Sequence, residues 1–171
     1  FNNTLIPQNE QSLALRVDGD GLEPGDSRAV FKNVSVDMRQ FKKLKMFVHA
    51  EALVDNVTFL EDDEMVAFIR FGNDFTENFY QVEIPLKKTQ FGDPSPEGIW
   101  PESNRIDIST ELLTKLKILA LNYVYTPGEI FYRNEDDPDM NPSASGKVNK
   151  LRLGIRGNPN FGLVRTLMVG I

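Results

Sequence analysis

The 171-residue sequence contains no cysteine, one histidine (His49) and one tryptophan (Trp100). The absence of cysteine excludes disulfide bonds, thiolate metal sites and thiol nucleophiles within the chain. No run of about 18 apolar residues occurs, so the sequence predicts no transmembrane helix. The phosphate-binding patterns GxxxxGK[ST] and GxGxxG are also absent. A formal net charge of −6 disfavours broad attraction to nucleic acid or anionic lipid.

The size and composition of the chain are those of one globular domain. Hydrophobic residues make up 40% of the sequence and charged residues 26%, which is ordinary for a globular protein. The sequence begins at Phe1 without a methionine and stops inside the strand-like stretch "TLMVGI". We therefore expect residues 1–171 to form a single domain that is a fragment of a much larger protein.

Strand-like alternation dominates the chain. In "LKMFVHAEA" (44–52) and "FYQVEIPL" (79–86), apolar side chains recur at every second position, as they do in a half-buried strand. The same period appears at 151–156 and 167–171, and further strands are expected at 12–17, 28–36, 57–60 and 118–125. The residues predicted to point inward are Leu44, Met46, Val48, Tyr80, Val82, Ile84, Leu153, Ile155 and Leu167.

Helical signals are few. "STELLTKLK" (109–117) offers Ser109 or Thr110 as an N-cap, and "DMRQFKKL" (37–44) has room for a single turn. Loops rich in glycine and proline separate the strands, notably at 18–26, 91–104, 134–146 and 156–162. Many short strands between such loops predict an all-β fold, a jelly-roll-like β-sandwich with one or two short helices.

The stretch "IRFGNDFTENFYQVEIPLK" (69–87) has a polar centre that could be a turn or a ligand site. Glycine and asparagine tolerate positive φ, and short polar side chains bond to their own backbone. We interpret the segment as a hairpin whose strands end near Phe71 and resume near Phe79. The alternative is a ligand site formed by the polar side chains of this loop, namely Asn73, Asp74, Glu77 and Asn78.

Catalytic patterns are weak. His49 lies on a predicted strand, and no nucleophile elbow accompanies it, so a Ser–His–Asp triad is not indicated. Acidic pairs such as Asp62 with Glu64 could suggest glycoside hydrolysis. Because the chain has 25 acidic residues, such pairs arise by chance, and we predict no enzyme and no catalytic residues.

Two acidic loops invite comparison with calcium sites. "VDGDGLEPGD" (17–26) places Asp18, Asp20 and Asp26 around glycines, but it lacks the regular ligand run and the final bidentate acid of a calcium loop. We predict no metal or other cofactor, with calcium at an acidic loop as the alternative. The second loop, "NEDDPDMNP" (134–142), supplies Glu135, Asp136, Asp137 and Asp139.

Aromatic and basic residues give two further candidate surfaces. Sandwich domains can hold sugars on aromatic platforms, and Trp100 in "GIWPE" is interpreted as an aromatic that anchors its loop on the core. A carbohydrate-binding module is the alternative function. Lys42, Lys43 and Lys45 are interpreted as a solvated face. The candidate platform residues are Trp100, Tyr123, Tyr125 and Tyr132.

Four long strings resemble one family. These are "RAVFKNVSVDMRQFKKLKMFVHAE" (28–51), "MVAFIRFGNDFTENFYQVEIPLK" (65–87), "WPESNRIDISTELLTKLK" (100–117) and "GIRGNPNFGLVRTLMVGI" (154–171). They are similar to SprA/Sov, the giant outer-membrane protein of Bacteroidetes linked to gliding motility and type IX secretion. The string "VDMRQFKKLKMFVHAE" also resembles the strand entry of galactose-binding-like jelly rolls.

The resemblance implies a role that composition alone does not supply. The intact protein would be a very large β-barrel that forms the type IX protein-secretion translocon. This chain would be a non-catalytic structural or interaction module of it, in the bacterial cell envelope on the periplasmic or cell-surface side of the outer membrane. The expected partners are other parts of the translocon and secretion-system proteins, with surface glycan as an alternative. The family supplies no catalytic, cofactor or metal residues.

Overall fold

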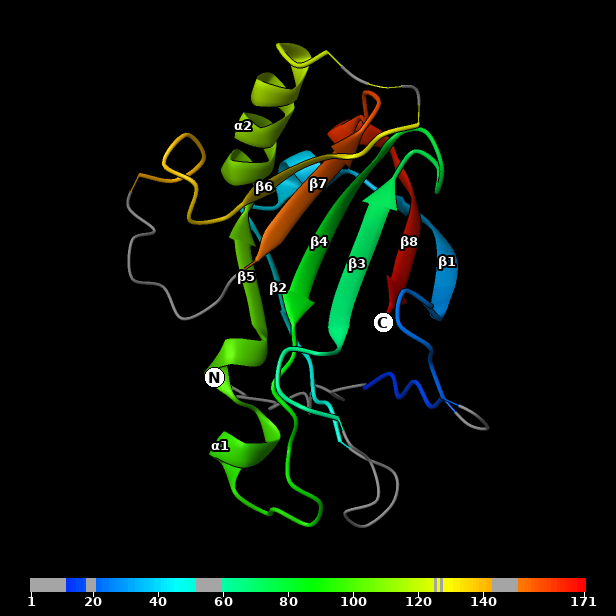
Figure 1. Cartoon of the computed structure of the whole chain (residues 1–171). Coiled ribbons are helices and arrows are strands. Elements are labelled where there is room, and N and C mark those ends of the chain that lie inside the picture. The colour runs from blue at the N-terminus through cyan, green and yellow to red at the C-terminus, as the bar shows by residue number, and fades with distance from the viewer. Residues whose placement is uncertain (1–11, 18–20, 52–59, 125, 127, 143–150) are drawn as a thin grey trace, which may run out of the picture.

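The computed structural model describes residues 12–17, 21–51, 60–124, 126, 128–142 and 151–171. Two antiparallel sheets pack face to face, as expected for an all-β sandwich (Figure 1). The larger sheet has six strands in the order β1-β8-β3-β4-β7-β6, and the smaller pairs β2 with β5. The fold class predicted from the sequence is confirmed.

The strand bounds follow the alternating segments of the sequence. The six-stranded sheet comprises β1 (Ala29–Val36), β3 (Val66–Gly72), β4 (Phe79–Pro85), β6 (Phe131–Asn134), β7 (Arg152–Arg156) and β8 (Val164–Gly170). The two-stranded sheet comprises β2 (Lys43–Phe47) and β5 (Arg105–Ser109). The helices are α1 (Pro96–Ile99) and α2 (Thr110–Leu121), with 3-10 turns at Met38–Gln40, Glu102–Asn104 and Phe161–Leu163.

A single hydrophobic core lies between the two sheets. Val82, Ile84, Leu153 and Ile155 are completely buried, and Tyr80 is 1% exposed. The remaining four residues predicted to point inward are partly buried and pack against this core, which confirms the predicted register. They are Leu44, Met46, Val48 and Leu167.

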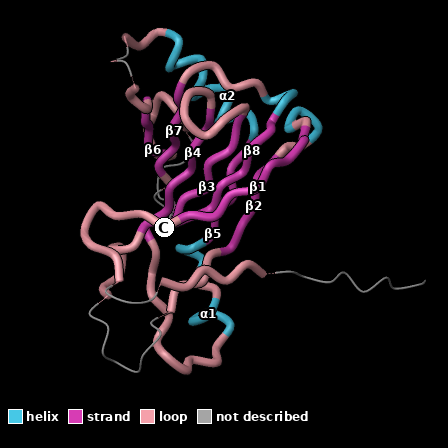
Figure 2. The backbone as a smooth tube through the Cα atoms, turned by 90° about the vertical axis from the view of Figure 1, so that its right-hand side faces the viewer, coloured by secondary structure: helices cyan, strands magenta, loops and turns pink. Residues whose placement is uncertain are grey.

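Helix α2 extends the smaller layer of the sandwich. Ser109 is its N-cap and accepts a hydrogen bond from the backbone N–H of Leu112. Leu112, Leu116 and Ala120 are spaced four residues apart and buried against the core. Helices α2 and α1 lie at opposite ends of the molecule (Figure 2).

Two predicted strands are wrong. Residues 12–17 form no strand, and most of the segment 118–125 belongs to α2 or to the turn that follows it. The run "ILALNYVY" is apolar enough to look like a strand, but the helix capped at Ser109 continues through its first half. The strand expected at 57–60 lies outside the described residues except for Leu60. Sequence reasoning missed β5 and β6, which are four or five residues long.

The polar centre of residues 69–87 is a hairpin loop, as predicted. Strands β3 and β4 pair antiparallel from Val66 with Pro85 to Gly72 with Phe79. The loop closes with a hydrogen bond of 2.9 Å from the backbone N–H of Asn73 to the carbonyl of Asn78.

Candidate functional site

The outward face of the six-stranded sheet carries a linked polar network on β3, β4, β6 and β7. The Arg70 guanidinium donates to Gln81 Oε1 at 2.7 Å, and Gln81 Nε2 donates to Glu83 Oε1 at 2.6 Å. The Tyr132 hydroxyl donates to the same Glu83 oxygen at 2.8 Å. The second Glu83 oxygen lies 3.4 Å from the Arg152 guanidinium. Because its members bond to one another, the network holds these four strands in a fixed lateral arrangement.

The ring of Tyr132 lies between a glycine and an arginine. Gly154 is the cross-strand partner of Tyr132, and a Cβ at Gly154 would stand only 2.6 Å from that ring. The Arg152 guanidinium stacks above the ring, 3.7 Å from its centroid. The position of Tyr132 therefore depends on the absence of a side chain at residue 154.

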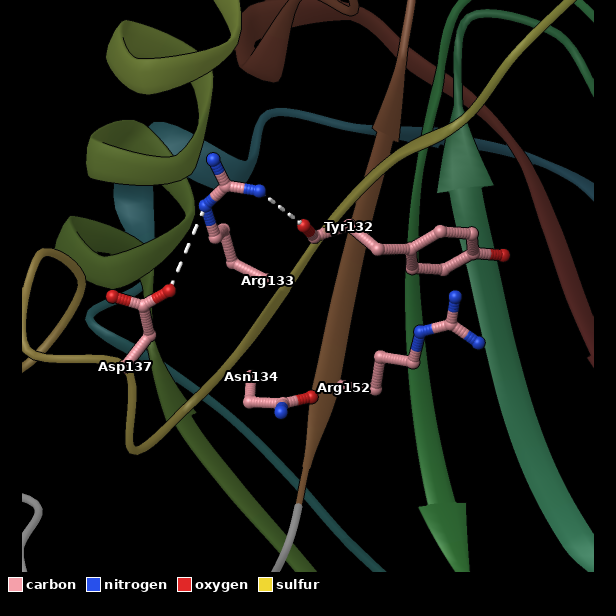
Figure 3. A pocket seen from close by; sticks show the side chains of 5 residues that line it. All are labelled: Tyr132, Arg133, Asn134, Asp137 and Arg152. Carbon is pink, nitrogen blue, oxygen red and sulfur yellow. Dashed lines mark hydrogen bonds and ion pairs between the residues drawn. The ribbon is translucent and has the colours of Figure 1, made fainter.

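A shallow cavity of about 310 Å³ opens at β6, the edge strand beside this network (Figure 3). The Arg133 guanidinium donates to the backbone carbonyl of Tyr132 at 2.9 Å and lies 3.6 Å from Asp137. The Asn134 amide and Arg152 complete its lining. Two guanidinium groups and an amide make the cavity rich in hydrogen-bond donors, so it can hold an anionic or carbonyl oxygen.

The cavity is electrostatically unsuited to proton transfer by its tyrosine. Burial raises the pKa of Tyr132, and the hydrogen bond to Glu83 raises it further. The phenol therefore remains protonated at neutral pH and acts as a donor. The lining residues supply binding groups but include no serine, histidine or cysteine that could act as a nucleophile with its base.

The side chain of Asp74 organises the hairpin loop. Asp74 Oδ1 accepts hydrogen bonds from the backbone N–H groups of Thr76, Glu77 and Asn78 at 2.5–3.0 Å. Burial alone would raise the pKa of Asp74, but these hydrogen bonds and one from the Asn78 side chain outweigh it and lower the pKa to about 2. The carboxylate is thus committed to the backbone of its own loop.

The two asparagines of the hairpin fasten a neighbouring loop. Asn73 accepts a hydrogen bond from the Asn160 backbone N–H at 2.7 Å and donates to the Leu163 carbonyl at 2.9 Å. Asn78 Oδ1 accepts one from the Asn158 backbone N–H at 3.1 Å.

The remaining acid of the hairpin also contacts the strand end beside it. Glu77 pairs with Arg156 at 2.8 Å, and Gly157, whose φ is +63°, passes close to the Glu77 carbonyl. The four polar side chains of the hairpin therefore bond within the loop or to neighbouring parts of the chain, which favours the turn interpretation over a ligand site.

His49 and Trp100 lie together on the outward side of β2 and β5. His49 Nδ1 is 2.9 Å from the Ile99 carbonyl, and Nε2 is 3.4 Å from Glu51. Trp100 is 47% exposed and meets Phe47 and His49 edge to face at 6.0 and 5.9 Å. Trp100 therefore anchors the α1 loop as expected, but on the outside of the small sheet and not on the core.

The acidic candidates do not converge in the described part of the chain. The carboxylate of Asp62 accepts from the Lys88 backbone N–H, and that of Glu64 accepts from the Glu61 backbone N–H, so each bonds to backbone within or beside its own turn. Among the described residues, no group of three or more histidine, cysteine or acidic side chains is placed to hold a metal ion.

The structure describes only part of the first acidic loop (17–26) but all of the second (134–142). Asp18 and Asp20 lie outside the described residues, and Asp26 lies 4.0 Å from Arg28. In the second loop, Glu135 is buried, Asp137 faces Arg133, and Asp136 and Asp139 are exposed.

The other aromatic candidates are scattered over the molecule. Tyr123 packs against Phe131 with ring centroids 5.0 Å apart, Tyr132 is covered by Arg152, and Tyr125 lies outside the described residues. The two described tyrosines, Tyr123 and Tyr132, do not form a common platform with Trp100.

The basic candidates are solvated, as interpreted from the sequence. Lys43 and Lys45 lie more than half exposed beside Asp107, at 3.0 and 3.8 Å, and Lys42 precedes their strand.

Sequence reasoning missed the network of Arg70, Gln81 and Arg152. Its members lie at the outward positions of β3, β4 and β7, where a polar residue normally indicates only that this face of the strand is exposed to solvent. One signal was available, because Arg152 and Arg156 alternate with the apolar residues of β7. The sequence does not show that Arg70 lies 4.1 Å above the Phe79 ring and buries it.

Residues 2–171 match the SprA_N family model, described as motility related/secretion protein. The chain belongs to this family. The match covers nearly the whole chain and confirms the SprA/Sov resemblance seen in the sequence. No curated protein matches this SprA_N chain. Its family supports a role related to motility or secretion and an association with the cell envelope, and no helix among the described residues is long and apolar enough to span a membrane.

Proposed function

We propose that this SprA_N chain is a non-catalytic structural and interaction domain of an SprA/Sov-type translocon. It would act in type IX protein secretion and gliding motility in the outer membrane of Bacteroidetes, on its periplasmic or cell-surface side. The observation that carries the proposal is the family match over residues 2–171. The partners would be other parts of the same translocon and secretion-system proteins.

The site geometry supports binding over catalysis. The polar side chains of the hairpin hold neighbouring backbone, and the outward network joins strands to one another. His49 contacts a backbone carbonyl and Glu51. We accordingly propose that the domain carries out no reaction and needs no cofactor. Calcium at an acidic loop stays the alternative, which a shift in melting temperature on adding calcium would test.

Deletion of this domain from the intact translocon tests the proposed role. Replacing the segment 1–171 by a flexible linker should reduce cargo secretion and gliding, while the shortened protein still reaches the envelope at normal levels. The point variant Val82→Asp, which places a charge in the core, should reproduce the loss. Val66→Asp on the neighbouring strand is the matched control, because Val66 is 38% exposed. Normal secretion by the deletion strain would contradict the proposal.

A carbohydrate-binding module is the second candidate, and the half-exposed ring of Trp100 favours it. Sugar binding would appear on a glycan array or on titration with surface polysaccharide. The variant Trp100→Ala should abolish it. Tyr132→Phe should leave it unchanged, because the Tyr132 ring is already covered by Arg152. The absence of binding to any glycan would remove this candidate.

A further inference from the structure

The two edges of the six-stranded sheet are protected to different extents. Strand β6 is four residues long, and the Arg133 guanidinium covers the Tyr132 carbonyl beside its edge. Strand β1 is eight residues long and is paired only with β8 among the described strands (Figure 1). Exposed edge strands are templates for pairing with another chain, and native proteins normally cover or shorten them.

The hydrogen bonds at the start of β1 show which backbone groups face outward. Arg28 and Ile171 exchange both backbone hydrogen bonds, at 2.9 and 3.0 Å. In an antiparallel ladder such pairs alternate along the strand. The N–H and C=O groups of Ala29, Phe31 and Asn33 therefore point away from β8. No hydrogen bond from another described segment reaches them.

Exposed apolar side chains flank these backbone groups. Phe31 is 67% exposed and contacts Phe75 edge to face at 5.2 Å. Val30, on the opposite face, is 42% exposed. It lines a small groove of about 100 Å³ with Leu15, Val17 and Ile171 among others. An incoming strand would find apolar contacts on both faces.

The charge of the edge selects among possible strands. Strand β1 contains Lys32 and no acidic residue, and Arg28, which precedes the strand, lies 4.0 Å from Asp26. Lys32 forms no ion pair with a described residue. A second copy of the chain would bring two cationic edges together, whereas an acidic strand would be attracted, although the chain as a whole carries a net charge of −6.

We propose that the free edge of β1 binds an extended acidic segment of a partner polypeptide by strand addition. The partner backbone pairs with Ala29, Phe31 and Asn33, while its alternate apolar side chains contact Phe31 on one face of the sheet. Its carboxylates lie on the other face, near Lys32, which shares that face with Val30. The inference refines the proposed interaction role by naming a surface and a partner chemistry, and the binding test below is independent of any secretion assay.

A peptide titration tests the edge directly. The probe is a short peptide of alternating valine and glutamate, blocked at both ends, added to the isotopically labelled 171-residue chain. Amide resonances of Ala29, Phe31 and Asn33 should shift, and their hydrogen exchange should slow. The amides of β6 serve as the internal control and should not respond. A peptide of alternating valine and lysine should bind at least about tenfold more weakly.

Two variants separate backbone pairing from other contacts. Phe31→Pro removes an outward N–H without touching the β1–β8 ladder, and proline is tolerated on edge strands. It should weaken peptide binding by about tenfold relative to Phe31→Ala, the matched variant that keeps the N–H. Lys32→Glu leaves the backbone intact and should reverse the preference between the acidic and basic peptides. Thermal melting of each variant establishes that the fold is retained.

Three results would overturn the inference. They are a lack of response at β1 to the acidic peptide, equal binding of both peptides by the unmodified chain, and self-association of the chain through β1 in sedimentation measurements. The first would leave the proposed role in secretion standing, because the deletion experiment measures that role without reference to β1.

Discussion

At the residue scale, two tyrosines, one buried and one partly buried, have opposite hydrogen-bonding situations. Tyr80 stacks on Phe161 with centroids 4.7 Å apart and on Phe71 at 5.8 Å, but its buried hydroxyl has no partner among the described residues. Burial accordingly raises the pKa of Tyr80. The Tyr132 hydroxyl, in contrast, donates to Glu83. The same chemical group should therefore contribute differently to stability at the two positions.

Removal of each hydroxyl tests this difference. Tyr80→Phe keeps the stacked ring and removes an unpaired polar group, so the free energy of unfolding should stay constant or rise by about 1 kcal/mol. Tyr132→Phe should lower it by about 1 kcal/mol because Glu83 loses a donor. Denaturant unfolding of both variants provides the measurement. Equal losses in the two variants would show that Tyr80 has a hidden partner.

Asp74 should make the hairpin sensitive to acid. Its pKa falls from the ordinary 3.8 to about 2 in the folded chain, so its stabilising contribution is fully present above pH 3.8. That contribution is lost as the pH falls toward 2, because the unfolded chain takes up the proton first. Asp74→Ala should lower the free energy of unfolding by about 1–3 kcal/mol at neutral pH.

The pH dependence of unfolding distinguishes Asp74 from other acids. Asp74→Ala should flatten the curve between pH 4 and 2 relative to the unmodified chain, because the pKa of Asp74 falls from 3.8 to about 2 on folding. Asp136→Ala is the control, since Asp136 is exposed. If both variants altered the curve equally, the hydrogen bonds to the hairpin backbone would not be the source of the effect.

At the scale of elements, alternation predicted the long strands well and the short ones poorly. Strands β1, β3, β4, β7 and β8 have five to eight residues and a clear apolar face. Strand β6 has four residues, too few for a period to stand out from the loops beside it. Strand β5 does alternate, but it runs directly into the α2 N-cap at Ser109, so the helix signal that begins there obscures the short strand pattern before it.

The candidate site was harder to predict than the fold. The alternation of side chains along each strand predicts that Arg70, Gln81 and Arg152 point outward. It does not predict that their three strands bring them together. That information lies in the strand order, in which β4 stands between β3 and β7. The close approach of Tyr132 to Gly154 likewise depends on the cross-strand register, which a single sequence does not fix.

A charge at the centre of β4 tests the register of the sheet. Val82 is completely buried between Ile69 on β3 and Leu153 on β7. Val82→Asp should therefore lower the free energy of unfolding by several kcal/mol, about 3–5, because the carboxylate would have no partner in the core. Val66→Asp should lower it by less than about 1 kcal/mol. Melting of the Val82 variant at the unmodified temperature would contradict the register.

At the scale of the whole molecule, one core joins both sheets and α2. Buried residues from β3, β4, β5, β7 and α2 belong to the same cluster. A single domain should therefore unfold in one cooperative transition. Fluorescence of Trp100, the one tryptophan, reports on the β2–β5 side, and far-ultraviolet circular dichroism reports on all strands. The two melting curves should coincide, and two separate transitions would indicate more than one domain.

The position of β8 has a consequence for the order in which the chain can fold. Strand β8 is inserted between β1 and β3, so in the described sheet these two earlier strands are joined through it. A chain synthesised from its N-terminus therefore displays an unpaired β1 and an open edge of β3 until β8 has been made. Strands so far apart in the sequence pair slowly, and until they pair their unpaired edges are prone to aggregation. We therefore expect the nascent chain to benefit from a chaperone that covers those edges until synthesis reaches Gly170.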